Sequence, residues 1–411
     1  MATRRKLATL FLTASLSWAS PVSADVVTDW NVITLQTNAA SVPPRGPTVI
    51  LDLAMVHVAM HDAIEAFEGR FESYAAPIAN ASGSPEAAAA QAAHDVLAAR
   101  FPPQAGSLDT VLASYLANLG LTGDAGLVTG QQAALQILQL RANDGSFPAN
   151  PEIFVGSTEP GQWRPTLPAF APMSAPWFGA VAPFTLKKDS EQLLASPPPP
   201  HLTSGKYLRD YNEVKALGSI NSTARTKEQT DLALFYSDNF LVQWQGTLRG
   251  IVDANIDDIG DSARLFALAN MAAADAIISA WANKRYWNFW RPITAIQEGD
   301  NDGNPRTVGD PSWLPFLPTP PYPDYTSGAN DLTGAMTRTL ERCFGKTLTF
   351  SVTSTAANQT KTYDRFSDMA DDVVNVRIYH GVHFRSADEV ARRQGTQVAD
   401  WAFSHVLRPI D

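Results

Sequence analysis

Apolar residues recur at helical spacing along most of this chain. In the segment 48–67 they repeat every three or four positions, and Gly69 follows as a stop signal. The same spacing predicts further helices at about 85–101, 107–119, 125–143, 206–216, 227–250, 261–284, 328–345, 364–380 and 387–407. The alternation typical of strands is limited to a possible short hairpin at 347–363. The sequence therefore predicts a mainly α fold.

Proline interrupts this pattern between about 146 and 204. Pro151, Pro160, Pro165 and the run 197–200 exclude long helices there. Aromatic residues such as Trp163 argue against a disordered tether. We interpret the stretch as an ordered connection that wraps one helical lobe onto another. The predicted division is an N-terminal helical lobe (25–150), a Pro-rich connection (151–226) and a helical domain that carries the site (227–411).

Residues 1–24 have the pattern of a secretory signal peptide. A basic start, Arg4 to Lys6, precedes an apolar core and the small-residue cleavage site Val22-Ser23-Ala24. The apolar core is too short for a comfortable membrane span, and we expect no span in the mature chain. The sequence predicts an exported protein, periplasmic or secreted.

Charge and cysteine content narrow the function classes. Removal of the leader deletes three of 31 basic residues and none of the 41 acidic ones, which leaves a net charge of −13. This balance excludes a basic surface for nucleic acid. The single cysteine, Cys343, excludes an internal disulfide framework, so a large apolar core must stabilise the fold.

Two histidines lie four apart on the predicted helix 48–67. His57 and His61 could chelate a metal ion, with Asp62 adjacent. No glutamate completes an HExxH motif, and no third ligand is suggested. Histidines that are packed in a core or satisfied by hydrogen bonds are the favoured interpretation.

The segment 284–292, KRYWNFWRP, places two cations among aromatic residues. Lys284 and Arg291 are seven apart, which returns them to nearly the same face of a helix. Pro292 disfavours a helical Arg291, so its guanidinium is expected at a helix end. The pattern suggests an anion held where little water enters; a surface Lys and Arg on an amphipathic helix is the alternative.

A second segment, 325–330, has the features of a helix start. Thr326 or Ser327 can cap the helix, and Gly328 allows the backbone to approach a ligand. Exposed N–H groups at a helix start form an anion site. Any capped helix shares this pattern.

A third segment, 377–385, places a histidine between two helices. Gly381 can end the helix that carries Arg377, and Ser386 is expected to cap the next, so His383 lies on a short connection. Asp388 is expected either to orient the His383 imidazole or, as an acidic residue in the first turn, to interact favourably with the helix dipole. Together the three segments supply cations, neutral donors and a ligating nitrogen, as a tetrahedral oxyanion requires.

These motifs resemble those of the superfamily shared by vanadium-dependent haloperoxidases and type 2 phosphatidic acid phosphatases. KRYWNFWRP matches the KxxxxxxRP signature, TSGA stands where PSGH is expected, and Arg377 with His383 matches the third signature. The stretches ADVVTDWN and MVHVAMHDAIEAF resemble the exported, haloperoxidase-like branch, so the likeness covers nearly all of the mature chain.

The resemblance implies a helical bundle architecture and an oxyanion site. The oxygens of vanadate, or of phosphate, would be held by Lys284, Arg291, Ser327, Gly328 and Arg377. His383 would be the vanadium ligand of a peroxidase that uses hydrogen peroxide and halide. In a phosphatase acting on a phosphate ester it would be the nucleophile.

The chain departs from the family pattern at three positions. Ala329 stands where the family has its acid/base histidine, Val376 replaces a common serine, and Asp388 lies one residue later than the usual acidic partner. Candidates to replace the missing group are Asp324, Asn330, Asp331 and His380. Three functions therefore remain open: a haloperoxidase-like enzyme, an acid phosphatase, or an oxyanion-binding protein with little turnover.

Overall fold

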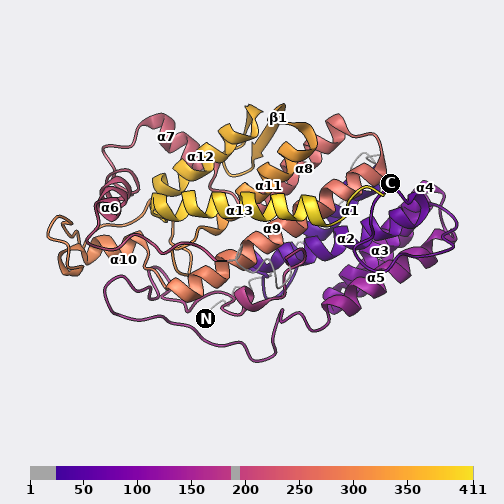
Figure 1. Ribbon diagram of the computed structural model, residues 1–411, viewed down its shortest axis with the longest axis horizontal. Helices are drawn as coiled ribbons and strands as arrows, with labels where there is room; N and C mark the ends of the chain where they lie inside the picture. Colours follow the sequence, from indigo (N-terminus) through magenta and orange to yellow (C-terminus); the bar gives the residue numbers. More distant parts are fainter. Residues whose placement is uncertain (1–24, 187–194, 411) are drawn as a thin grey trace, which may run out of the picture.

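The computed structural model describes residues 25–186 and 195–410. Within these ranges the chain forms thirteen α-helices and one two-stranded sheet, which confirms the predicted mainly α class (Figure 1). The predicted signal peptide lies outside the described residues. The first helices are α1 (Val26–Ala39), α2 (Val49–Glu68), α3 (Pro85–Arg100), α4 (Ala105–Leu119) and α5 (Gly126–Arg141).

The second half of the chain contains the remaining elements. These are α6 (Gly205–Leu217), α7 (Lys227–Phe235), α8 (Phe240–Asn255), α9 (Ile259–Trp287), α10 (Pro292–Gln297), α11 (Gly328–Phe344), β1 (Thr347–Ser354), β2 (Gln359–Arg365), α12 (Phe366–Tyr379) and α13 (Arg385–His405). The helices α2 to α5 gather at one end of the molecule, and α6 and α10 lie at the other (Figure 1).

The long helix α9 is the centre of the packing. It contacts α2, α11 and α13, and its alanines at 267, 269 and 272–274 are completely buried. By length and composition α9 could cross a membrane, but 94% of its most apolar window is buried inside the protein. Such burial identifies α9 as a core helix. It carries Lys284 in its last turn, beneath the start of α11.

Much of the Pro-rich connection runs along one edge of the molecule, below α9 in the view of Figure 1. Residues 142–186 and 195–204 form no α-helix, yet Trp163 and Phe178 are fully buried. The Phe178 ring lies 5.4 Å from the ring of Trp281 on α9. Asp275 of α9 accepts hydrogen bonds from the backbone N–H groups of Phe184 and Thr185, which fixes the connection to the core helix.

The structure corrects two predicted helices. The predicted helix 227–250 is two helices, because the chain breaks before Asn239, whose side chain caps α8 by accepting from the N–H groups of Leu241 and Val242. The helix that carries Lys284 ends at Trp287, where Asn288 adopts a left-handed φ of 46°. Arg291 is therefore not on the helix of Lys284, and it precedes α10 in an extended conformation.

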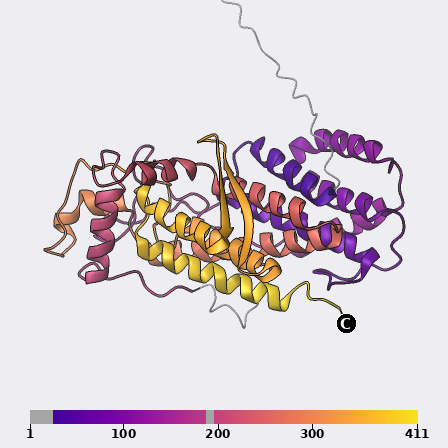
Figure 2. The ribbon, with the colours of Figure 1, turned by 90° about the horizontal axis from the view of Figure 1, so that it is seen from above.

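Two smaller expectations are also changed. The helix α1 is not evident in the sequence because it buries polar residues such as Asn31 and Thr34 beside its apolar ones. Ser386 does not cap α13, since its hydroxyl and N–H both donate to Asp210. The predicted hairpin is confirmed: β1 and β2 pair antiparallel, with β1 against α8, and they cross one face of the molecule (Figure 2).

Candidate active site

The three motifs meet around one pocket of about 320 Å³. Arg377, His383 and the start of α11 line this pocket, together with apolar side chains of α9. On the opposite side it is lined by Gly46, Pro47 and residues 238–241. Lys284 and Arg291 are both 0% exposed and do not line the pocket, so they form a buried layer behind it.

A glycine turn aims His383 at this pocket. Gly381 has a φ of 77°, and a Cβ there would lie 2.3 Å from the carbonyl oxygen of Gly218. The turn therefore excludes any side chain at 381. His383 Nε2 accepts from Arg291 Nη1 at 3.1 Å, and Nδ1 lies 2.8 Å from Asp324 Oδ1. Arg291 Nη1 also lies 3.4 Å from Nδ1, so both ring nitrogens are within reach of this guanidinium.

Burial and charge keep His383 neutral. Burial lowers the pKa of His383 well below its ordinary value, and the neighbouring cations Arg291 and Lys284 lower it further. Burial also raises the pKa of Asp324 well above the usual range, against the attraction of the same two cations. The neutral imidazole keeps one unprotonated ring nitrogen, as a metal ligand or a nucleophile needs, and a ligand at Nε2 would replace its contact with Arg291.

Arg291 is held rigidly by backbone carbonyls. Its Nε donates to Tyr322 O at 2.7 Å, and Nη1 donates to Val382 O at 2.6 Å. The second terminal nitrogen, Nη2, is buried without a partner among residues 25–186 and 195–410. Arg291 thus has one donor group left for an anion.

Lys284 donates hydrogen bonds to the loop that precedes α11. Its ammonium donates to the carbonyl oxygens of Pro323 at 2.9 Å and Asp324 at 3.1 Å, and also to that of Thr326. Burial lowers the pKa of Lys284 well below its ordinary value, and the charge of Arg291 adds to this effect. All three ammonium hydrogens have acceptors. Lys284 would therefore have to break one of these hydrogen bonds before it could bond an anion directly.

The start of α11 offers neutral donors. Ser327 is its N-cap residue, and the buried Oγ has no hydrogen-bond partner in the described part of the chain. Gly328 opens the helix, and a Cβ there would lie 3.1 Å from a ring carbon of Trp281. Glycine thus lets the helix start approach the pocket floor. The positive end of the helix dipole then faces the pocket.

Arg377 is positioned by a histidine. Its Nη1 donates to His380 Nδ1 at 3.1 Å, and His380 Nε2 donates to the carbonyl oxygen of Ala233 at 2.7 Å. Burial lowers the pKa of His380 to about 3, so this ring stays neutral. Arg377 Nε has no partner among the described residues. His380 therefore orients Arg377 and does not reach the pocket.

Asp388 faces a different partner from the one the sequence suggested. It lies in the first turn of α13, and its Oδ1 accepts from Asn330 Nδ2 at 2.8 Å. Asp331 accepts from the hydroxyl of Thr326 at 2.9 Å. None of these side chains lines the pocket, whereas Ala329 does. The carboxyl beside His383 is Asp324, which spacing along the chain does not single out.

The other histidine pair is structural. His57 Nε2 lies 2.8 Å from Asn31 Nδ2, and its ring stacks on Phe266 at 4.7 Å. His61 Nε2 lies 3.1 Å from the carbonyl oxygen of Glu72. No group of three metal-binding side chains occurs in the described residues. The interpretation of both as core histidines is confirmed.

Part of the chain is similar in sequence to known proteins. Residues 264–411 match the model described as the VCPO second helical-bundle domain. Vanadium chloroperoxidase of Curvularia inaequalis is 28% identical over 231 residues, which cover 48% of this chain and 37% of that relative. The chain thus spans little more than a third of that protein's length.

Solved structures agree over a longer range. The first bacterial vanadium-dependent iodoperoxidase superposes with a TM-score of 0.79 at 24% identity, covering 95% of this chain and 99% of the other. An apo-type bacterial vanadium-dependent chloroperoxidase gives 0.73 at 18% identity, covering 90% and 96%. At these identities the likeness establishes the fold.

The motif-based resemblance is therefore confirmed. Residues 264–411 match the helical-bundle domain of that family model, and the chain has the helical-bundle fold of the compared vanadium enzymes, as the motif-based resemblance implied.

Proposed function

We propose that this chain binds vanadate at the Arg377–His383 pocket and oxidises halide with hydrogen peroxide. One observation carries the proposal: buried polar groups around the pocket lack partners among the described residues. These groups are Arg291 Nη2, Arg377 Nε and Ser327 Oγ. Proteins rarely leave such groups unpaired, and their shared preference is for an oxyanion.

The residues present fit vanadate as the cofactor. Arg377, Ser327 and the N–H of Gly328 would hold its oxygens, Arg291 would add its free Nη2, and His383 Nε2 would bind the metal. Lys284 would contribute charge from behind the Pro323–Thr326 loop. Bound vanadate supplies the Lewis acid that activates hydrogen peroxide toward halide.

The chain's own residues prepare this chemistry in three ways. Asp324 places a buried carboxyl 2.8 Å from Nδ1 of His383, on the ring nitrogen that would not bind the metal. Carbonyl contacts fix Arg291 and Lys284 before any ligand arrives. Trp281 and Leu332 form apolar walls, and the exclusion of water strengthens every charge interaction inside.

The relatives favour halide oxidation among the possible reactions. The compared proteins are a chloroperoxidase and an iodoperoxidase, both named as vanadium enzymes. Acid phosphatase activity is the second candidate, because a neutral His383 among cations is also what a phosphohistidine nucleophile requires. Ala329 at the pocket supports the third candidate, a binding protein with little turnover.

The decisive experiment measures both reactions side by side. Purified protein is assayed for iodide, bromide and chloride oxidation with hydrogen peroxide, and for p-nitrophenyl phosphate hydrolysis, with and without added vanadate. A haloperoxidase gains halide oxidation on addition of vanadate. A phosphatase hydrolyses the ester, and vanadate inhibits this hydrolysis. Vanadate binding by calorimetry without either activity would leave the binding protein as the answer.

A further inference from the structure

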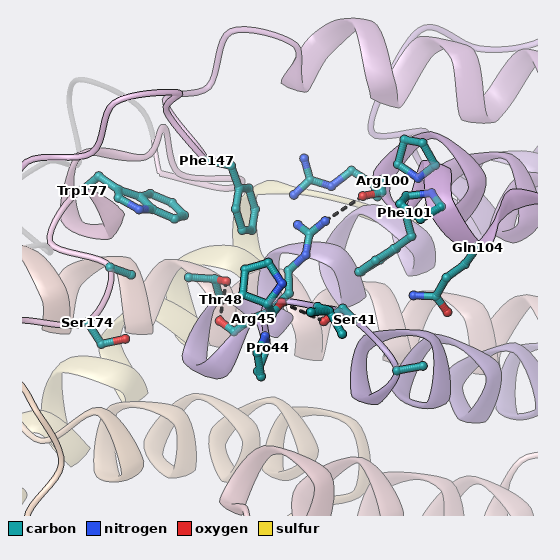
Figure 3. A pocket seen from close by; sticks show the side chains of 16 residues that line it. Ser41, Pro44, Arg45, Thr48, Arg100, Phe101, Gln104, Phe147, Ser174 and Trp177 are labelled. Atoms are coloured by element: carbon teal, nitrogen blue, oxygen red, sulfur yellow. Dashed lines mark hydrogen bonds between the residues drawn. The ribbon is translucent and has the colours of Figure 1, made fainter. Parts of the chain in front are cut away.

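A second and larger pocket lies beside the active site. It has a volume of about 730 Å³ and is bounded by residues 40–45 after α1, residues 100–104 after α3, and parts of the Pro-rich connection. Figure 3 shows its side chains: the guanidinium groups of Arg45 and Arg100 lie close together beside the ring of Phe147, with Trp177 on the far side of that ring.

The two arginines share one carboxylate. Arg100 Nε donates to Asp52 Oδ1 at 2.8 Å, and Arg45 Nη1 lies 3.5 Å from the same oxygen. Asp52 is 0% exposed, and Arg45 Nη2 donates to the carbonyl oxygen of Arg100 at 2.6 Å. Arg100 Nη2 is buried without a partner among the described residues. The cluster thus keeps one uncompensated positive charge and one unused donor.

Aromatic rings surround this charge. The guanidinium carbon of Arg45 lies 4.2 Å from the ring centres of both Phe101 and Phe147, and that of Arg100 lies 4.8 Å from Phe147. The rings of Phe147 and Trp177 are 4.9 Å apart. A stacked guanidinium keeps its edge free for a planar, bidentate anion. Trp177 adds an apolar face on which a flat ring can lie.

The pocket shares its wall with the active site. Arg45 and Thr48 line the larger pocket, while Gly46 and Pro47 between them line the active-site pocket. Trp281 lines the active site and donates from Nε1 to the carbonyl oxygen of Ser174, at 3.1 Å, and Ser174 lines the larger pocket. A molecule in the larger pocket is therefore one layer of side chains away from His383.

From this arrangement we infer that the pocket binds a planar aromatic carboxylate. The carboxylate bonds the unused Nη2 of Arg100 and neutralises the residual charge of the Arg45–Arg100 pair, and the ring packs against Phe147 and Trp177. An inorganic anion would leave the aromatic walls unused, and a neutral ring would leave the Arg100 donor unpaired. This inference does not depend on the reaction at His383.

Binding of 2-naphthoate to the full chain, followed by isothermal titration calorimetry, tests this site. The neutral isostere 2-naphthamide and the non-aromatic cyclohexanecarboxylate serve as matched probes. We expect 2-naphthoate to bind at least about tenfold more tightly than either, because each lacks one of the two recognised features. Equal affinity for naphthoate and naphthamide, or no naphthoate binding at millimolar concentration, would overturn the inference.

Variants locate the binding. Arg45→Gln removes the residual charge and should weaken naphthoate at least about tenfold while leaving naphthamide unchanged. Arg285→Gln is the matched control, since Arg285 also stacks on a phenylalanine, Phe154 at 4.2 Å, and pairs with a carboxylate, but at the surface. It should change nothing.

Two further measurements separate this pocket from the active site. Naphthoate affinity should be the same in the Arg377→Ala variant and in the presence of saturating vanadate. Displacement by vanadate would assign the carboxylate to the active site and overturn the inference. If Arg45→Gln does not fold, Trp177→Leu keeps every ion pair of the cluster and should weaken both naphthoate and naphthamide; unchanged affinities would equally refute the site.

Discussion

Asp324 Oδ1 lies 2.8 Å from His383 Nδ1, and this contact joins the loop before α11 to the turn before α13. Both side chains are buried, so neither can exchange its partner for water. Histidines that bind metals are commonly oriented in this way by a carboxylate or carbonyl.

The first prediction concerns this contact. Asp324→Asn should lower vanadate affinity and turnover by about 10- to 100-fold, because losing the carboxyl beside a metal-binding histidine commonly costs that much. Calorimetry with vanadate and a halide oxidation assay measure the two effects. Asp388→Asn is the matched control, since Asp388 faces Asn330 instead. A loss confined to the Asp388 variant would show that Asp388 orients the histidine.

The second prediction concerns Arg377. Arg377→Ala should weaken vanadate and phosphate together, by roughly 1.5–3 kcal/mol, because hydrogen bonds to charged groups contribute about that much. Competition between the two anions in the wild-type protein establishes that they share one site. Arg385→Ala controls for the loss of an arginine nearby, since Arg385 pairs with Glu213 outside the pocket. Unchanged vanadate affinity in Arg377→Ala would contradict the shared oxyanion site.

The sequence predicts most helices because their apolar faces repeat locally. The α2 and α11 segments can be recognised without any distant contact. Their apolar residues repeat at helical spacing, and a glycine directly follows each helix. The break between α7 and α8 is different. It depends on Asn239, a residue that caps one helix and could equally sit within a longer one.

The residues of the site also fall into two groups, those that the sequence predicts and those that it does not. Lys284, Arg377 and His383 can be found from spacing and residue type. The role of Asp324 cannot, because it depends on the path of the loop that brings residue 324 back to residue 383. The carbonyls that surround the Lys284 ammonium come from that loop as well. Backbone acceptors carry no side-chain signature, so no motif reveals them.

The third prediction separates the histidines by role. His383→Ala should abolish turnover with little change in melting temperature, whereas His57→Ala should lower stability by about 2–4 kcal/mol. His57 fills space against Phe266 and meets Asn31, so its removal leaves a cavity and an unpaired amide. Thermal unfolding and activity are measured on the same preparations. His57→Ala with no activity and an unchanged melting temperature would place that residue in the site.

The fourth prediction is a pH dependence. Burial raises the pKa of Asp388 to about 7, although Ser327, Arg377 and Asn330 oppose the shift. Below about pH 4 the carboxyl is protonated in both the folded and unfolded states. Between about pH 4 and 7 only the folded state keeps the proton, so the contribution of Asp388 to stability falls as pH rises.

Asp388→Asn removes this dependence. The variant should gain stability relative to wild type as pH rises from 4 to 8, by roughly 1–4 kcal/mol in total. Urea unfolding at both pH values gives the difference. A stability difference that is constant with pH would show that Asp388 titrates alike in both states.

The last prediction concerns Ala329, where the chain departs from the motif of the superfamily that it resembles. Ala329 lies in the first turn of α11 and lines the same pocket as Arg377 and His383. A histidine at 329 would add an acid/base group to a pocket in which no described side chain other than His383 offers an imidazole.

Ala329→His should raise turnover in the native reaction by at least about tenfold, within the 10²- to 10⁴-fold range of a general acid/base. The helix should tolerate the change, since histidine costs only about half a kcal/mol more than alanine. Ala329→Asn is the control for added bulk and polarity without a titratable group, and it should stay at wild-type activity. Flat activity in a folded, vanadate-binding Ala329→His protein, beside measurable wild-type turnover, would mean that another group already transfers the proton. Wild-type activity at background together with a flat variant would instead favour a protein that holds its oxyanion without turnover.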